Sequence, residues 1–342
     1  MKLKTVLFGT TYAFGSVKDV LNKAGEPRSG DTLAGVAASS MRERAAAKQV
    51  LSELTLGDLR ENPVVPYEGD AVTRIIQDAV HGPIHASVRN WTVAESREFL
   101  LDGRTSAADI KRVRKGLTSE MSTAVSKIMS NADLICAAKK MPVVVRSNNT
   151  VGLPVRFSSR LQPNDTRDDV SSIVAQGYEG LSYGSGDAVI GINPVTDTVE
   201  NTKAMLDALW EVIKRHRIHA QNCVLAHVTT QMEAIRQGAN ASMIFQSLSG
   251  SEKGLGEFGV GVGLLDEAYD LAAHCCQAAG PNVMYFETGQ GSALSADARK
   301  AIQEGWLESR VKGPGGAAGG PEGAGAEVFP PIAEKKLAIP AG

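Results

Sequence analysis

The sequence predicts an α/β protein in which a mainly helical N-terminal region precedes a domain of parallel strands of the (β/α)8, or TIM-barrel, type. Three observations predict this class. Strong helix formers fill most of residues 1–135, and from residue 141 short apolar runs alternate with amphipathic helical patterns. These βα units follow one another at intervals of about 20–45 residues, which fits the spacing of a barrel.

The N-terminal helices are predicted from helix formers and from apolar residues that recur on one face. We expect helices over 35–54, 70–78, 96–101 and 116–135. Ser119 could cap the last of these. Its apolar face carries Met121, Val125, Ile128 and Met129.

Five short apolar runs are predicted to be buried parallel strands, each followed by polar residues. They are 141–145, 188–192, 223–226, 242–245 and 282–286. Amphipathic helices are expected over 198–214, where Asp197 and Glu200 have capping spacing, and over 256–278. An open, doubly wound sheet is the alternative, but Gly184 and Gly186 precede a strand, whereas a nucleotide-binding glycine motif follows one.

Composition and charge narrow the class of function. The 342 residues carry 36 basic and 38 acidic side chains, and this net charge of −2 provides no field for nucleic acid. Four irregularly spaced cysteines predict a reduced, cytoplasmic protein without a structural zinc site. The sequence has neither an apolar run of membrane-spanning length nor a signal-peptide pattern, so we expect a soluble protein that is not secreted.

Polar side chains follow the predicted strands, where the loops of a barrel build its site. In chain order they include Arg160, Gln162, Asn193, Pro194, His227, Gln246, Glu287 and Ser295. Most of these are amides or hydroxyls, with one guanidinium and one carboxylate. Such groups suit a small polar ligand and a cofactor held by hydrogen bonds, and no metal site is predicted.

Two of the charged residues also have a purely structural interpretation. Glu287 could cap the next helix or pair locally with a cation. Arg160 could be the ion-pair partner of one of three nearby carboxylates, those of Asp165, Asp168 and Asp169.

Two further features have a structural interpretation that is at least as good as the functional one. His227 at a strand end is more often a hydrogen-bonded packing residue than a catalytic base. The segment 250–254 (GSEKG) is similar to a phosphate-binding loop but lacks the spacing of a nucleotide-binding motif.

Longer strings are more specific than these patterns. In the helical region they are RSGDTLAGVAASS (28–40), AAKQVLSE (46–53), RKGLTSE (114–120) and SNADLICAAKKMPV (130–143). In the second region they are RLQPNDTRDDV (160–170), GDAVIGINPVTD (186–197), LAHVTTQ (225–231), IFQSLSGSEKGL (244–255) and YFETGQGSALSA (285–296). Together they closely resemble the large, catalytic subunit of ethanolamine ammonia-lyase over residues 1–296.

The resemblance implies a lyase that converts ethanolamine to acetaldehyde and ammonia with adenosylcobalamin. It implies that the substrate is bound by Arg160, Gln162, Asn193 and Glu287, with Glu287 and Arg160 as the catalytic pair. It implies cofactor contacts at Pro194, Gln246 and Ser295. It also implies a small partner subunit, a homo-oligomer of large subunits, and a cytoplasmic location or one inside a bacterial microcompartment.

The resemblance ends at Ala296, and this affects the expected domains. We expect a helical region over 1–135, a partial barrel of about five βα units over 136–296, and an unrelated tail over 297–342. The tail is rich in Gly, Ala and Pro from residue 313, so 313–342 is expected to be disordered.

Two alternatives to an active lyase follow from these expectations. The first is a truncated, non-catalytic remnant or interaction subunit of the same complex, because five strands would leave the barrel open. The second is an ordinary barrel enzyme that acts on a phosphorylated substrate through the segment 250–254.

Overall fold

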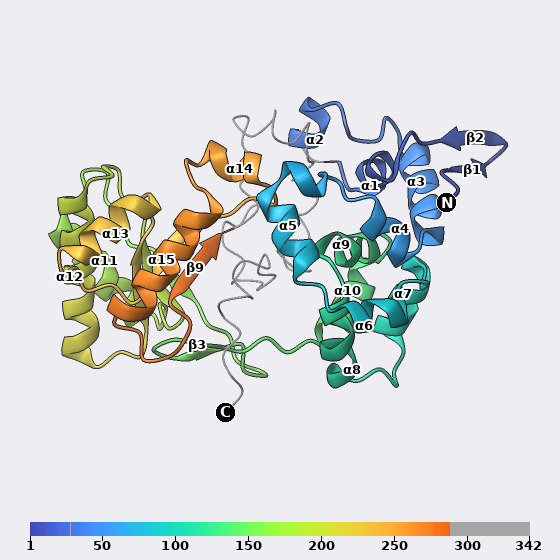
Figure 1. The fold of residues 1–342 in the computed structure, drawn as a ribbon. Coiled ribbons are helices and arrows are strands. Elements are labelled where there is room, and N and C mark those ends of the chain that lie inside the picture. The colour runs from blue at the N-terminus through green and yellow to red at the C-terminus, as the bar shows by residue number, and fades with distance from the viewer. Residues whose placement is uncertain (28, 288–342) are drawn as a thin grey trace. The chain divides into compact units, whose positions relative to one another are not determined.

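The computed structural model describes residues 1–27 and 29–287 (Figure 1). The described chain forms two compact units. The first contains Met1–Pro142 together with Ser249–Gly259, and the second contains Val143–Leu248 together with Val260–Glu287. The expected tail over 297–342, with its disordered part, lies outside the described residues.

The first unit is mainly helical, and it begins with a hairpin that the sequence analysis did not predict. Strands β1 (Lys4–Leu7) and β2 (Thr10–Ala13) pair antiparallel through a turn at Phe8 and Gly9, which both have positive φ. The helices are α1 (Val17–Ala24), α2 (Ser29–Leu33), α3 (Met41–Glu53), α4 (Leu56–Glu61), α5 (Ala71–Asp78), α6 (Gly82–Val88), α7 (Val93–Leu101), α8 (Ala107–Val113), α9 (Ser119–Lys127), α10 (Asn131–Ala138) and α14 (Glu252–Glu257).

The helix expected over 116–135 is two helices, because the sequence contains a second start signal. Ser130 caps α10 by accepting the backbone N–H of Asp133, and the Asp133 carboxylate accepts the N–H of Ser130 in return. The start of α9 also differs from the expectation, since Thr118 rather than Ser119 accepts the N–H of Met121.

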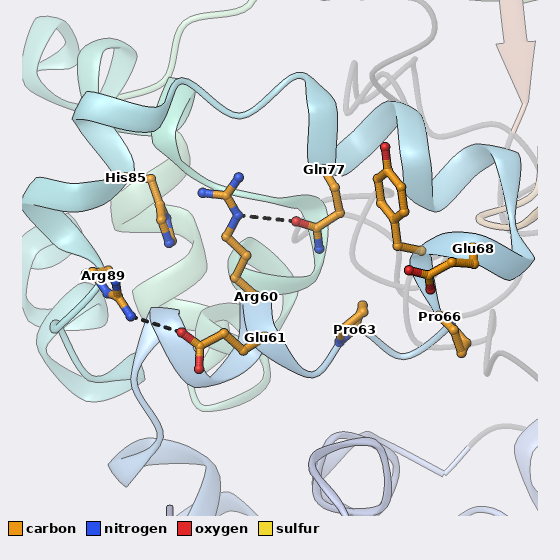
Figure 2. A pocket seen from close by; sticks show the side chains of 9 residues that line it. Arg60, Glu61, Pro63, Pro66, Glu68, Gln77, His85 and Arg89 are labelled. Carbon is orange, nitrogen blue, oxygen red and sulfur yellow. Dashed lines mark hydrogen bonds and ion pairs between the residues drawn. The ribbon is translucent and has the colours of Figure 1, made fainter.

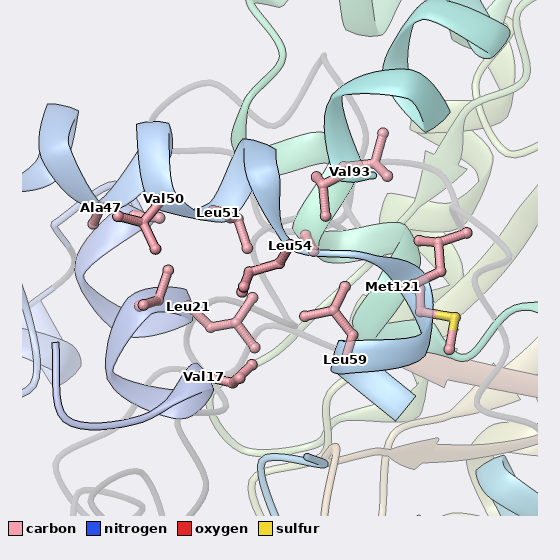
Figure 3. Close-up of a cluster of buried hydrophobic side chains, with 14 of the residues drawn as sticks. Val17, Leu21, Ala47, Val50, Leu51, Leu54, Leu59, Val93 and Met121 are labelled. Carbon is pink, nitrogen blue, oxygen red and sulfur yellow. The ribbon is translucent and has the colours of Figure 1, made fainter. Parts of the chain in front are cut away.

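Apolar side chains from α1, α3 and their neighbours form the core of the first unit. Figure 3 shows this cluster, in which Val17 and Leu21 of α1 face Ala47, Val50 and Leu51 of α3. Its members are almost completely buried. Each fully buried leucine or valine contributes about 1.5–3 kcal/mol, so the helical unit has a hydrophobic core of its own.

Glu120 on α9 is a carboxylate buried next to this apolar core. Its Oε1 accepts the backbone N–H of Val64 at 3.0 Å, while Oε2 is buried and has no hydrogen-bond partner among the described residues. Burial raises the pKa of Glu120 to about 7; the Val64 N–H and the Lys18 ammonium oppose this rise, and the Asp70 carboxylate adds to it. The carboxyl group is therefore about half protonated at neutral pH.

We expect Glu120→Gln to stabilise the chain at pH 8 and to have little effect at pH 5. The folded pKa of Glu120 lies above the ordinary value of 4.5, so the folded state holds a proton that the unfolded state releases. The free energy of unfolding therefore falls as the pH rises from about 4.5 to about 7, and it levels off above that range. Glutamine avoids this loss, which should amount to about 3 kcal/mol.

Urea unfolding of the parent chain and the variant at both pH values measures the difference. Comparison at each pH cancels the titration of all other groups. Lower stability of the variant at pH 8 would show that the ionised carboxylate is stabilising, contrary to this prediction.

The second unit contains parallel strands alternating with helices, which confirms the α/β class with parallel sheets. Strands β5 (Arg160–Leu161), β6 (Val189–Ile192) and β7 (Gln221–Val224) form one parallel sheet, and β8 (Ile244–Ser247) and β9 (Met284–Glu287) form another. The helices between them are α11 (Val170–Ser182), α12 (Val199–His216), α13 (Val228–Arg236) and α15 (Val262–Cys275).

The first predicted strand of this region is wrong. Residues 141–144 are not in a strand, and β3 (Val145–Arg146) pairs antiparallel with β4 (Thr150–Val151) in a short hairpin. The first parallel strand is β5, which is too short to stand out as an apolar run. As a result, Arg160 lies within a strand and not in the loop that follows one.

Two helix boundaries also differ from the expectation. The helix expected over 256–278 is α14 and α15, separated at Gly259, whose φ of 67° is left-handed. Thr198, not Asp197, caps α12, and the Asp197 carboxylate accepts the backbone N–H of His227 at 2.7 Å instead. In the described part of the chain, no helix combines the length and the apolar character needed to cross a bilayer.

Candidate functional site

The site predicted from the strand ends lies in the second unit, and strand pairing determines which side chains share a face. Arg160 on β5 is in register with Val189 on β6, and side chains alternate between the two faces of a strand. Gln162 comes directly after the end of β5, and Asn193 comes directly after the end of β6. Tyr285 and Glu287 share a face of β9 by the same rule.

Contacts within the second unit show that the Tyr285 side chain of β9 meets the Arg160 side chain of β5. The Arg160 Nη1 donates to the Tyr285 hydroxyl at 3.4 Å, and the guanidinium lies 5.7 Å from the centre of the tyrosine ring. Tyr285 also packs against a small buried cluster that contains Val189, Cys223 and Met243. Arg160 and the strand that ends in Glu287 therefore contribute to one interior.

Arg160 has no counter-ion among the described residues. Its Nε and Nη2 are buried and make no hydrogen bond in the described structure. Leaving charged donors unpaired in a buried position costs free energy on the order of a few kcal/mol. Such an arrangement is characteristic of a site that a polar ligand completes.

The three carboxylates near Arg160 bind other groups, so the ion-pair interpretation of Arg160 is wrong. Asp165 accepts the backbone N–H of Arg167 at 2.8 Å, and Asp169 accepts that of Ser172 at 2.8 Å. Asp168 accepts hydrogen bonds from the residues that follow β6.

Asp168 is a residue whose importance the sequence analysis did not recognise. Its carboxylate accepts the backbone N–H groups of Val195 and Thr196 at 2.7–3.1 Å and the Asn201 amide at 2.8 Å. Burial alone would raise the pKa of Asp168, but these donors outweigh it and lower the pKa below 3.8. Asp168 thus stays ionised and fixes the loop that carries Asn193 and Pro194.

The loop after β6 has a second attachment. Asn164, in the loop after β5, accepts the backbone N–H of Asn193 at 3.1 Å. The Asn193 side chain is exposed and Pro194 is half-buried. The loops after two neighbouring parallel strands are therefore joined by hydrogen bonds beside Arg160 and Gln162.

Burial keeps the neighbours of Arg160 uncharged. The pKa of Tyr285 is raised to about 12, mainly by burial, with the Arg160 charge opposing the rise and the Glu287 carboxylate adding to it. Burial likewise raises the pKa of the Cys223 thiol to about 12, against the effect of Arg160. A neutral hydroxyl and a neutral thiol therefore face the guanidinium.

Glu287 and Gln246 lie on paired strands but on different faces. Glu287, at the end of β9, is half-buried and in register with Ser247 of β8. Gln246 is buried, and alternation places it on the opposite face from Phe245, whose ring contacts Tyr285. Its Nε2 donates to the carbonyl of Ser247 at 2.9 Å. Ser295 lies outside the described residues.

His227 and the segment 250–254 have structural roles. The His227 Nδ1 contacts the Thr229 hydroxyl at 2.7 Å and caps α13, which agrees with the packing interpretation. In the segment 250–254, Ser251 caps α14 and the Glu252 carboxylate accepts the N–H of Ala71. The backbone N–H groups of Glu252 and Gly254, which a phosphate would need, donate to Asp70 and to Ser251 instead.

A cavity of about 650 Å³ is present in the first unit, and it contains none of the predicted residues. Figure 2 shows its lining, in which Arg89 pairs with Glu61 at 2.9 Å and Arg60 donates to Gln77 at 3.3 Å. The Arg89 and Glu61 side chains are more than half exposed. Surface ion pairs of this kind contribute about 0–1 kcal/mol, and the cavity shows no buried group in need of a ligand.

Comparisons with known proteins identify relatives that match 92% of the chain. The family model for the ethanolamine ammonia-lyase large subunit matches residues 12–315, a range that continues past Ala296. The chain is 60% identical to the ethanolamine ammonia-lyase large subunit of Escherichia coli strain K12 over 313 residues, which are 92% of this chain and 69% of that protein. The chain is 59% identical to the ethanolamine ammonia-lyase large subunit of Salmonella typhimurium strain LT2 over 313 residues, which again are 92% of this chain and 69% of that protein.

Proposed function

Because the chain belongs to the family of ethanolamine ammonia-lyase large subunits, which are carbon–nitrogen lyases, we propose that it converts ethanolamine to acetaldehyde and ammonia with adenosylcobalamin. The observation that supports this most directly is Arg160, whose buried Nε and Nη2 have no partner in the described chain. It shares an interior with the strand that ends in the carboxylate Glu287. A cation and an anion at one site match the two polar ends of an aminoalcohol.

The substrate chemistry assigns a role to each residue. The ammonium group of ethanolamine requires a carboxylate, which Glu287 provides through a charge-assisted hydrogen bond. The hydroxyl group accepts from the Arg160 guanidinium, which stays charged and so orients the substrate without exchanging protons. The amides of Gln162 and Asn193 provide further donors and acceptors next to Arg160.

The proposal of a TIM-type barrel rests on the order of the parallel strands. We propose that β5 to β9 belong to a TIM-type barrel, since successive strands are connected by α11, α12, α13 and α15. In such a barrel the loops at the carboxyl ends of the strands form the site. We also propose a helical region over 1–135 and a barrel region that begins at 136; the family match to residue 315 corrects the expectation that the family sequence ends at 296.

The residues at the end of β6 fit a large cofactor held through hydrogen bonds. Pro194 is half-buried on a loop that Asp168 and Asn164 hold in place, so its backbone carbonyl is already positioned. We propose that Pro194, Gln246 and Ser295 hold adenosylcobalamin. When bound, this cofactor supplies the radical that removes a hydrogen atom from the substrate. The protein binds and orients ethanolamine and excludes water from the site.

The proposed assembly includes other subunits. We propose a small subunit as partner, a homo-oligomer of large subunits, and a location in the cytoplasm or in a bacterial microcompartment. No nucleic-acid or membrane partner forms part of this proposal.

Reconstitution tests the proposed activity. The chain, purified together with a small subunit, should release acetaldehyde when both ethanolamine and adenosylcobalamin are present, and should give a Co(II) and radical signal in electron paramagnetic resonance. Omission of either compound is the control. Absence of both signals from the complete mixture would refute the activity and support the non-catalytic alternative.

A further inference from the structure

Tyr285 is the only described residue that hydrogen-bonds to the Arg160 side chain. The hydroxyl accepts from Nη1 at 3.4 Å, and the ring lies 5.7 Å from the guanidinium carbon. An unrestrained arginine side chain has about 2 kcal/mol of rotamer entropy, and these two contacts restrict where its charge lies. Tyr285 also lies two residues before Glu287 on the same face of β9.

Gly191 on β6 provides the space that the guanidinium occupies. A Cβ atom at this position would lie 3.3 Å from the Arg160 Nε and 3.5 Å from its Nη2. The same Cβ would lie 3.1 Å from the Cys223 Sγ, which is buried and cannot move away freely. A methyl group at this position would therefore require the Cys223 sulfur or the Arg160 Nε to shift by a few tenths of an ångström.

We propose that Tyr285 and Gly191 are positioning residues for Arg160: the tyrosine hydroxyl holds one end of the guanidinium, and the glycine leaves room for its opposite edge. This inference rests on the proposed function and extends it to residues that are not expected to touch ethanolamine. An arginine that is already fixed loses little entropy when the substrate hydroxyl binds, and it stays aligned with the carboxylate at the end of β9.

Tyr285→Phe removes the hydroxyl and keeps the ring in the core. We expect kcat/KM for ethanolamine to fall by about 10–100-fold, while the affinity for adenosylcobalamin stays within about twofold. A merely structural defect would weaken cofactor binding as well. Tyr183→Phe is the matched control, because this tyrosine is largely exposed, and it should leave both quantities unchanged.

A double-mutant cycle on stability tests the contact without any turnover. Tyr285→Phe should raise the unfolding equilibrium constant of the parent chain by about tenfold, which corresponds to a loss of about 1.4 kcal/mol in the free energy of unfolding. In the Arg160→Met background the same change should have almost no effect. Equal effects in the two backgrounds would show that the hydroxyl does not hold Arg160, and they would overturn the proposal.

Gly191→Ala tests the second half of the proposal. We expect kcat/KM to fall at least tenfold, and the addition of Cys223→Ala, which removes the closest neighbour, to restore part of the loss. Parental activity in Gly191→Ala would remove the glycine from the proposal. An inactive parent complex refutes the proposed function, whereas the stability cycle tests the Tyr285 contact whether or not the complex is active.

Discussion

Replacing Glu287 by glutamine should abolish measurable turnover of ethanolamine, with a loss of at least ~10³-fold in kcat. Glutamine keeps the shape of the side chain at the end of β9 but removes the negative charge that the ammonium group requires. The half-buried position makes the loss large, because water replaces the missing charge poorly there. Acetaldehyde release by the complex with the small subunit measures the effect, and calorimetric titration with ethanolamine measures the loss of binding.

Glu211→Gln is the matched control for Glu287→Gln. This substitution also removes a carboxylate, but on the exposed side of α12. There the Glu211 Oε1 lies 3.8 Å from the Arg215 Nη2. Its effect on turnover and on ethanolamine binding should be negligible. Turnover of Glu287→Gln within about threefold of the parent would remove Glu287 from the site.

Replacing Arg160 by methionine is expected to have opposite effects on activity and on stability. Turnover should fall by at least ~10²-fold, because the substrate hydroxyl loses its charged donor. The free energy of unfolding should rise by about 1–2 kcal/mol, because methionine fills similar space without burying the unpaired donors Nε and Nη2. Urea unfolding and acetaldehyde release on the same preparations measure both changes.

The sign of the stability change tests in solution the absence of an ion pair at Arg160 that the structure shows among the described residues. A structural ion pair would make Arg160→Met destabilising by about 3–5 kcal/mol. Arg215→Met, at an exposed position on α12, is the control and should change neither property. A destabilised Arg160→Met variant would therefore contradict the ligand-binding role.

The sequence predicts the α/β class because its signals are local. Amphipathic periods identify α12 and α15, and four apolar runs correspond to β6, β7, β8 and β9. The first strand was misplaced because β5 has two residues, one of them the charged Arg160, whereas the apolar segment 141–145 lies mostly outside any strand. Apolar patterning cannot identify a two-residue strand in which the inward-facing side chain is an arginine.

The candidate site was predictable as a set of residues but not as a set of contacts. Strand ends and the family resemblance both lead to Arg160 and Glu287. The partner of Arg160 is Tyr285, a residue 125 positions away in the chain, and no local pattern connects the two. Asp168 was considered only as a counter-ion, because its true partners are backbone N–H groups, which every residue except proline provides.

The reciprocal contact between Asp70 and Glu252 determines when the N-terminal unit can be completed during synthesis. Asp70 accepts the backbone N–H of Glu252 at 2.6 Å, and Glu252 accepts that of Ala71 at 2.7 Å, across 181–182 residues of chain. A ribosome adds about 5–20 residues per second, so the first helices wait about 10–40 s for α14 to emerge. During that interval the start of α5 lacks its partner, and a chaperone that binds nascent chains would find an incomplete helical unit there.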